Sequence, residues 1–198
     1  MRRRRLILGL GAVLAAVSGT LVLGAWRSRA AQPALILPLP LTEMSWQLTN
    51  HRGQSVTPSD WAGRPVMAFF GFTFCPDVCP TTLNDISDWL EALGPEAAPL
   101  VVALITVDPD RDGPQELADY LSNFDARITG LTGSAEEIAR TAADFRVRYE
   151  KVARDDGDYT MNHTAGIFLF RPDGRFVSII DFHDDRRFAV PKIRRALG

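Results

Sequence analysis

The chain contains two cysteines, Cys75 and Cys79, and both lie in the ten-residue stretch GFTFCPDVCP, residues 71–80. Three chemistries fit such a pair: a structural disulfide, a redox-active dithiol, or two soft ligands for a metal ion. The three intervening residues still permit a disulfide, but they also allow the sulfurs to separate and bind one cation. A disulfide that closes so short a loop would add little stability by restricting the unfolded chain.

A third ligand for a metal would have to come from one of the three histidines. His51 lies in a polar turn, where we expect a solvated loop residue, and His183 lies in an acidic segment, where we expect a surface role. His163 directly precedes the apolar run 164–170. If that run is antiparallel to a strand over 65–72, its start lies beside the cysteines. The residues alone leave open whether His163 is a ligand or a hydrogen-bonded structural histidine.

Two thiolates and one imidazole would form an unsaturated metal site. Thiolates select Cu(I), zinc or iron–sulfur clusters, whereas structural zinc sites and iron–sulfur clusters usually take four protein ligands. Three ligands, two of them soft, therefore favour Cu(I), and the imidazole also permits Cu(II). An open coordination position would allow the metal to be passed on.

The segments around the cysteines predict a βαβ unit. PVMAFFGF (65–72) and PLVVALITVD (99–108) are continuous apolar runs, typical of strands buried on both faces. Between them, apolar residues recur at helical spacing from Pro80 until Gly94. Two strands joined by a helix are expected to be parallel, with a right-handed crossover.

This unit places the cysteines where an open α/β sheet binds ligands. Cys75 follows the first strand and Cys79 lies at the N-terminus of the helix, at the carboxyl edge of the sheet. The free N–H groups and partial positive charge of a helix N-terminus favour a thiolate over a thiol. Asp77, between the cysteines, opposes this effect. We therefore expect some lowering of the thiol pKa.

The remaining elements complete a mixed α/β fold. Residues 45–57 predict a hairpin, 113–124 and 134–145 predict helices, 164–181 predict a strand, a turn and a strand, and 184–197 predict a helix started or interrupted by a proline. A central mixed sheet with helices on both faces and an added N-terminal hairpin is the plan of a thioredoxin-like sandwich.

The first part of the chain predicts a membrane anchor. Residues 1–30 contain six arginines and no acidic residue, and 6–26 form an uncharged apolar run. A helix of this length spans about 31 Å, which favours an uncleaved transmembrane anchor over a signal cleaved near residue 30 or an arginine-pair export signal. Residues 31–41 predict a Pro-rich spacer and 42–198 the folded domain. The flanking arginines place that domain on the periplasmic side of a bacterial inner membrane.

The charge of the folded part excludes one class of partner. After residue 30, 16 basic residues face 24 acidic ones, without a basic stripe. An acidic domain of this kind argues against nucleic-acid binding. Outside the cytoplasm, a close cysteine pair can be oxidised, and its reduction would need a dedicated supply of electrons.

Three motifs resemble one known family. GFTFCPDVCP followed by TTL, ITVDPDRD at 105–112 and NHTAGIFLFRPDG at 162–174 are similar to the SCO/SenC family of membrane-anchored copper proteins, over roughly residues 42–197. The resemblance implies a thioredoxin-like fold. It also implies that the protein delivers copper to, or reduces the cysteines of, the copper A site in subunit II of cytochrome c oxidase. Other periplasmic copper chaperones are further implied partners.

The resemblance assigns the family's metal ligands to Cys75, Cys79 and His163. Two positions depart from the family pattern: Phe74 replaces a frequent histidine or tyrosine, and Asn162 replaces an acid before the histidine. Neither position is a ligand in the family. An amide in place of a carboxylate would weaken the support of the imidazole and alter Cu(II) affinity.

The acidic segment DPDRD, residues 108–112, follows the second predicted strand and has two interpretations. In the functional interpretation, the segment is a docking surface or an outer partner of the cysteine site. In the structural interpretation, it is a solvated acidic turn, in which Asp112 caps the next helix.

Three functions compete for the cysteine pair. The first is a copper-binding assembly factor, and the second is a thiol–disulfide reductase in which Cys75 and Cys79 form the redox pair and His163 is dispensable. The third is a thiol peroxidase, which needs a nearby threonine and arginine around its reactive cysteine. Thr73 lies two residues before Cys75, but the sequence places no arginine near the loop.

Overall fold

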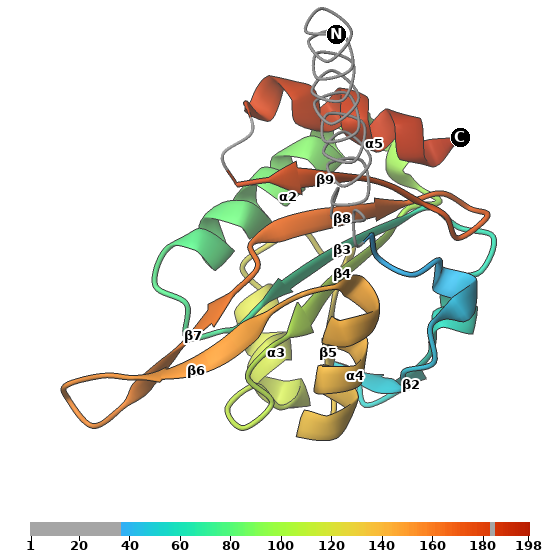
Figure 1. Ribbon diagram of the computed structural model, residues 1–198. Helices are drawn as coiled ribbons and strands as arrows, with labels where there is room; N and C mark the ends of the chain where they lie inside the picture. The colour runs from blue at the N-terminus through green and yellow to red at the C-terminus, as the bar shows by residue number, and fades with distance from the viewer. Residues whose placement is uncertain (1–36, 183–184) are drawn as a thin grey trace, which may run out of the picture. The chain divides into compact units, whose positions relative to one another are not determined.

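The computed structural model describes residues 37–182 and 185–198, and a seven-stranded mixed sheet lies at its centre (Figure 1). Its strands are β1 Leu48–Asn50, β2 Ser55–Val56, β3 Val66–Gly71, β4 Val101–Thr106, β5 Ile128–Thr132, β8 Gly166–Phe170 and β9 Phe176–Asp181. The order across the sheet is β2-β1-β5-β4-β3-β8-β9. Two further strands, β6 Tyr149–Ala153 and β7 Tyr159–His163, pair only with each other in a second sheet, which we call the ribbon.

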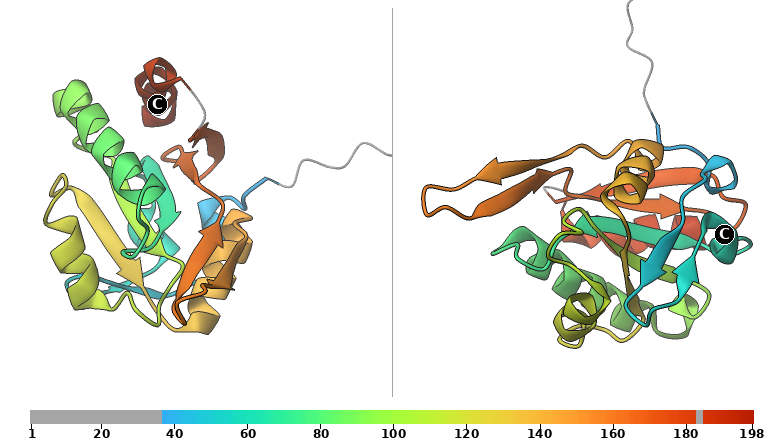
Figure 2. Two further views of the ribbon diagram at one scale, coloured as in Figure 1. Left: turned by 90° about the vertical axis from the view of Figure 1, so that its left-hand side faces the viewer. Right: turned by 90° about the horizontal axis from the view of Figure 1, so that it is seen from below.

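Helices cover both faces of the large sheet (Figure 2). They are α2 Val78–Leu93, α3 Pro114–Leu121, α4 Ala135–Phe145 and α5 Ala189–Leu197, with short 3-10 helices at Leu41–Glu43, Pro58–Trp61, Gly94–Ala97 and Arg186–Phe188. Within this part of the chain no helix is long and apolar enough to cross a membrane. The predicted anchor over residues 6–26 lies outside the described residues.

The predicted βαβ unit is confirmed. β3 and β4 are parallel in a register that pairs Val66 with Val101 and Gly71 with Thr106, and α2 connects them. Every residue of both strands is buried, as their continuous apolar sequences predict. β8 runs antiparallel to β3, which is the arrangement that brings the start of the 164–170 run toward the end of β3. The mixed sheet with an N-terminal hairpin is also confirmed.

Alternating residues of the central strands pack against different helices. On one face, Phe145 of α4 contacts Phe70 of β3 and Phe168 of β8 at ring-centre distances of 5.2 and 5.7 Å. On the other face, Gly71 of β3 approaches Cys79 of α2. The cysteine helix is therefore seated directly on the buried centre of the sheet.

The sequence analysis missed three strands. β5 lies between the two predicted helices α3 and α4 and pairs in parallel with β4. β6 and β7 of the ribbon were assigned to no element, because neither contains a run of buried apolar residues: four of the five residues of β6 are exposed, and Met161 alone is buried in β7. In Figure 1 the ribbon extends away from the large sheet. Its last residue is His163, so the histidine ends a strand instead of lying in a loop.

Candidate metal centre

The two cysteines lie on either side of the start of α2. We call the connection between β3 and α2, residues 72–77, the cysteine loop. Cys75 is half-buried in this loop, whereas Cys79 lies in the first turn of α2 and is 0% exposed. Both are free cysteines, and the backbone N–H of Cys79 donates a hydrogen bond to Sγ of Cys75 at 3.4 Å. The helix begins two residues before Pro80, so its N-terminal N–H groups surround the sulfurs.

A glycine allows the buried sulfur to lie against the sheet. A Cβ at Gly71 would lie 3.1 Å from Sγ of Cys79 and 3.0 Å from a ring carbon of Phe69. Such contacts are closer than packed atoms tolerate. The absence of a side chain at this position therefore permits the close approach of α2 to β3.

The two thiols have opposite pKa shifts. The hydrogen bond from the Cys79 thiol lowers the pKa of Cys75 to about 5, with further contributions from the backbone N–H groups of Asp77 and Cys79 and from His163. The same hydrogen bond and burial raise the pKa of Cys79. In the metal-free chain, Cys75 is therefore the thiolate and Cys79 the thiol that donates to it, which confirms the expected lowering for one of the two cysteines.

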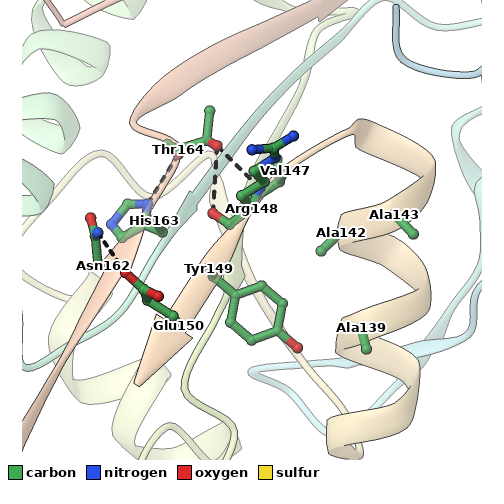
Figure 3. Close-up of a pocket in the computed structure, with 10 residues that line it drawn as sticks. All are labelled: Ala139, Ala142, Ala143, Val147, Arg148, Tyr149, Glu150, Asn162, His163 and Thr164. Atoms are coloured by element: carbon green, nitrogen blue, oxygen red, sulfur yellow. Dashed lines mark hydrogen bonds between the residues drawn. The ribbon is translucent and has the colours of Figure 1, made fainter. Parts of the chain in front are cut away.

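His163 faces the buried cysteine across 84 residues of sequence. Its Nε2 lies 3.7 Å from Sγ of Cys79, and its Nδ1 lies 3.0 Å from the carbonyl oxygen of Thr164 (Figure 3). A carbonyl oxygen only accepts, so Nδ1 of the neutral ring carries the proton and Nε2 has the free lone pair. The ring nitrogen that faces the sulfur is thus the one able to bind a metal ion.

The imidazole is positioned by aromatic rings and the backbone. The ring centres of Phe69 and Phe72 lie 6.4 and 5.9 Å from that of His163, both edge-on. The amide of Asn162 instead donates to Glu150 at 3.0 Å, so the backbone carbonyl of Thr164 is the polar support of the ring. A groove of about 690 Å³ lies between α4 and the ribbon, and His163, at the end of β7, is one of its lining residues (Figure 3).

The candidate ligands are close, but they are not assembled as a complete metal cage. Among residues 37–182 and 185–198, no three His, Cys, Asp or Glu side chains form a ready cluster. The Cys79–His163 separation of 3.7 Å nevertheless fits two ligands of one ion. Metal–sulfur and metal–nitrogen bonds of about 2.3 and 2.0 Å at trigonal angles would place the two atoms about 3.7 Å apart. Cys75 is adjacent through its hydrogen bond to Cys79.

A buried carboxylate holds the cysteine loop through hydrogen bonds. Asp112 is 0% exposed and accepts hydrogen bonds from the backbone N–H of Thr73 at 3.0 Å, from the Thr73 hydroxyl at 2.6 Å and from the Thr106 hydroxyl at 2.6 Å. Burial raises the pKa of Asp112, and these hydrogen bonds oppose the shift. The prediction that Asp112 caps a solvated turn is wrong, because α3 has Gly113 as its N-cap without a side-chain cap.

The structure also brings an arginine to the cysteine loop. The guanidinium of Arg111 lies 4.5 Å from the ring centre of Phe74, beside Cys75, although the sequence suggested no such neighbour. It forms an ion pair with the buried Asp108. The Thr73 hydroxyl donates to Asp112 and is thereby engaged away from the sulfur. Within the described residues, neither side chain forms a hydrogen bond to Sγ of Cys75, as a peroxidase would require.

His51 does not join this site. Nδ1 of His51 accepts a hydrogen bond from the backbone N–H of Gly130 at 3.0 Å, so this half-buried side chain ties the β1–β2 turn to β5. The expected position in a loop is confirmed, but the ring is half-buried and hydrogen-bonded instead of fully solvated. His183 lies outside the described residues.

Three residues build the surroundings of the site, and the sequence analysis expected an outer partner of the cysteine site only from the segment that contains two of them. Asp112 and Arg111 belong to the recognised DPDRD segment, but nothing in their order predicts burial or stacking. Tyr159, whose hydroxyl donates to Asp108 at 2.9 Å, lies in the ribbon that was missed. The Asp155-Asp156-Gly157 turn signal was available and would have revealed that hairpin.

Comparison with known proteins places the chain among relatives of one kind. The mitochondrial "SCO2 homolog" of mouse is 36% identical over 179 residues, which cover 87% of this chain and 69% of the mouse protein. The corresponding zebrafish protein is 41% identical over 140 residues, 69% of this chain and 50% of its own length. The chain thus spans about half to two thirds of the curated relatives it matches.

Solved structures give the same result for the fold. ScoI of Bradyrhizobium japonicum, determined with copper bound, is 44% identical and superposes with a TM-score of 0.71, covering 76% of this chain and 96% of that one. Yeast Sco1 with copper bound is 31% identical, also with a TM-score of 0.71, covering 80% and 87%. A model of the family described as SCO1/SenC matches residues 38–198. With this match over most of its length, the chain belongs to the SCO1/SenC family.

Proposed function

We propose that this chain binds one copper ion through Cys75, Cys79 and His163 and carries it as cargo to another protein. The observation that carries this proposal is the 3.7 Å separation of Cys79 Sγ from Nε2 of His163, beside the Cys75 thiolate. Two sulfurs and one imidazole form a soft and unsaturated donor set. The copper-bound relatives support the choice of metal.

The burial of the two sulfurs suggests how the ion enters and leaves. Cys79 is enclosed by α2 and β3, whereas Cys75 is half-buried in the cysteine loop. An incoming thiolate of a partner protein therefore meets the copper on the Cys75 side and displaces that sulfur first. Copper transfer then proceeds by stepwise ligand exchange, with each departing thiolate free to take up a proton.

The recipient that we propose is the copper A site in subunit II of cytochrome c oxidase. This assignment rests on the family to which the chain belongs and on the role that its motifs imply. We further propose that residues 6–26 anchor the chain in a bacterial inner membrane, with the copper-binding domain on the periplasmic side. Such an anchor would keep the domain at the membrane that contains the oxidase.

Copper titration of the reduced chain tests the proposal. We expect one copper ion per chain, measured by competition with a chromophoric Cu(I) chelator. Cys75→Ser and Cys79→Ser should each abolish tight binding, and His163→Ala should weaken it by at least about tenfold, as expected for loss of one ligand. His51→Ala is the matched control, because this histidine bonds to β5. Tight copper binding by the Cys75→Ser/Cys79→Ser double variant would contradict the assigned site.

A second function, thiol–disulfide reduction, is favoured by the opposite pKa shifts of the two thiols. The Cys75 thiolate would attack a disulfide of the partner and release one partner thiolate. Cys79 would then lose its proton and attack Cys75, forming the Cys75–Cys79 disulfide and releasing the second partner thiol. Two electrons pass to the partner, and an external dithiol must reduce the pair again.

The His163→Ala variant separates the two functions. A reductase needs only the cysteine pair, so we expect its electron transfer to a peptide disulfide to remain within about twofold of the unmodified chain. Copper transfer by the same variant should collapse. If the His163→Ala variant still transfers copper but no longer reduces the disulfide, then His163 serves the reductase and not the copper site, and both assignments are wrong.

A further inference from the structure

Arg111 lies between two aromatic rings that belong to different parts of the candidate site. Its guanidinium carbon is 4.5 Å from the ring centre of Phe74 and 3.7 Å from that of Tyr159. Phe74 directly precedes Cys75, and Tyr159 begins the strand β7 that ends at His163. The guanidinium therefore contacts both segments that carry candidate ligands.

Hydrogen bonds along the guanidinium edge hold it in this place. Nε of Arg111 donates to Oδ2 of Asp108 at 2.5 Å, and Nη1 donates to the carbonyl oxygen of Tyr159 at 3.2 Å. The hydroxyl of Tyr159 donates to the other carboxylate oxygen of Asp108 at 2.9 Å. Asp108 is 1% exposed and lies two residues beyond β4, so this arrangement is fixed to the central sheet.

The third nitrogen of the guanidinium, Nη2, lies beside aromatic rings instead of any described hydrogen-bond acceptor. Nη2 of Arg111 is buried, and within the described part of the chain it has no hydrogen-bond acceptor. Its neighbours are the faces of two rings, and aromatic faces attract a cation. A planar guanidinium can stack on two rings and donate in its plane at the same time, whereas a lysine ammonium cannot.

Among the described residues, the ribbon is otherwise supported by the buried Met161 and by the partly buried Tyr149 and Tyr159, which pack against the core. β6 and β7 pair only with each other, and four of the five residues of β6 are exposed. The views in Figures 1 and 2 agree that the ribbon extends away from the large sheet. Lys151 adds an exposed ion pair with Asp110, which screening by water weakens. The partly buried contacts of Arg111 with Asp108 and Tyr159 are less exposed to such screening and are the stronger connection.

We propose that Arg111 is a positioning residue that joins the cysteine loop to the histidine strand and so sets the distance from His163 to the two sulfurs. The proposal rests on the proposed copper site, because its main effect is on copper binding. Within the described part of the chain, Arg111 forms no hydrogen bond or ion pair with the two cysteines or His163. It acts through Phe74 on one side and through Tyr159 on the other.

The first test removes the ring that links Arg111 to the cysteine loop. Phe74 is 59% exposed, so Phe74→Leu leaves the core intact. In the full-length chain we expect its Cu(II) affinity, measured by competition, to fall by about tenfold, as outer-shell changes at metal sites do. Phe74→Tyr restores the ring and should restore affinity. Arg111→Lys should also weaken binding, with thermal unfolding as the check that it remains folded.

A double-variant cycle separates positioning from a general structural effect. If Arg111 and Phe74 act through His163, Phe74→Leu should change affinity by less than about twofold when His163→Ala is already present. An equal tenfold loss in both backgrounds would overturn the proposal. Arg154→Met removes an exposed arginine from the same ribbon and should leave affinity within about twofold of the starting value.

A copper-free measurement keeps this proposal distinct from the proposed function. If the unmodified chain binds no copper, the copper assignment fails, but positioning can still be tested by NMR of the His163 ring nitrogens. Those signals should shift in Phe74→Leu and return in Phe74→Tyr. Unchanged His163 signals in Phe74→Leu would overturn the positioning role, whether or not copper binds.

Discussion

The cysteine loop and the ribbon each carry part of the candidate site, but they are held in different ways. The loop follows β3, whose six residues are all buried, and the buried Asp112 bonds to it from below. The ribbon consists of two strands that pair only with each other, and most residues of β6 are exposed. The sulfur of Cys79 is thus part of the core, and the half-buried Cys75 packs against it, whereas the imidazole stands at the end of a strand that pairs only within the ribbon.

This difference separates the two tasks of a site that must both bind and release an ion. Burial of Cys79 and the hydrogen bonds of Asp112 keep the sulfur pair in place through packing that few changes can alter. The position of His163 depends on the contacts at the base of the ribbon, chiefly those of Arg111 and Tyr159. We therefore expect substitutions that remove the buried contacts of the loop to affect folding, and substitutions among the contacts at the base of the ribbon to affect ligand geometry.

The largest effect on stability should come from Asp112→Ala. The change leaves the hydroxyls of Thr73 and Thr106 and a backbone N–H without their acceptor, and we expect a loss of about 3 kcal/mol in the free energy of unfolding. Urea denaturation measures it. On the ribbon, Asn162→Ala removes one exposed hydrogen bond to Glu150 and should cost less than about 0.5 kcal/mol. Similar losses of stability in Asp112→Ala and Asn162→Ala would contradict the difference between the cysteine loop and the ribbon.

Alkylation of the reduced, metal-free chain should distinguish the two sulfurs. The thiolate is the reactive form, and the pKa of Cys75 is lowered to about 5, chiefly by the hydrogen bond from Cys79. Its reaction with iodoacetamide should therefore be level above about pH 6 and decline below pH 5, whereas an ordinary thiol slows already below about pH 8.5.

The variant that tests this explanation is Cys79→Ala. Without the donated hydrogen bond, the pKa of Cys75 should rise toward its ordinary value, and alkylation at pH 6 should slow by on the order of 100-fold. His51→Ala is a control that leaves the sulfur pair untouched. A profile of Cys75 that is identical with and without Cys79 would show that the hydrogen bond is not the cause.

Gly71→Ala should test how tightly the buried sulfur is packed. The new Cβ would meet Cys79, Phe69 and Leu104 at 3.0 to 3.1 Å, and all three side chains are buried in the core. We expect a loss of about 2 kcal/mol in the free energy of unfolding. Gly113→Ala makes the same change where the new atom meets only the end of the flexible Glu116 side chain, and it should be close to neutral. Equal effects would mean that the sheet under α2 yields easily.

The smallest effects should come from a pair of identical substitutions. Val66→Thr places a hydroxyl in the fully buried β3, where it lacks room for water, and should cost about 1.5 kcal/mol. Val152→Thr makes the same change on the ribbon, where the side chain is 39% exposed, and should cost less than about 0.5 kcal/mol. Thermal or urea unfolding of both variants gives the comparison directly. A larger loss of stability in Val152→Thr than in Val66→Thr would contradict the claim that the ribbon is packed less tightly than β3.

The central strands and the cysteine helix were predictable because each is encoded by a pattern within one short stretch of sequence. Continuous apolar runs indicated β3, β4 and β8, and periodic apolar residues with Gly94 at the end indicated α2. β5 was not predictable in the same way, since its five residues, ITGLT, gain their strand character from pairing with β4. The ribbon was missed because its polar residues are exposed on both faces and bury no apolar pattern.

For the candidate site, the sequence by itself determined the donor types and the elements that bear them. Two thiols at a strand–helix junction and an imidazole before an apolar strand follow from residue identity and local pattern. The tertiary structure decided which nitrogen faces Cys79, that Asp112 is buried under the loop, and that Arg111 lies between two rings. These contacts join residues 84, 39 and 48 positions apart in the chain. They depend on strand register and side-chain packing, which no short stretch of sequence encodes.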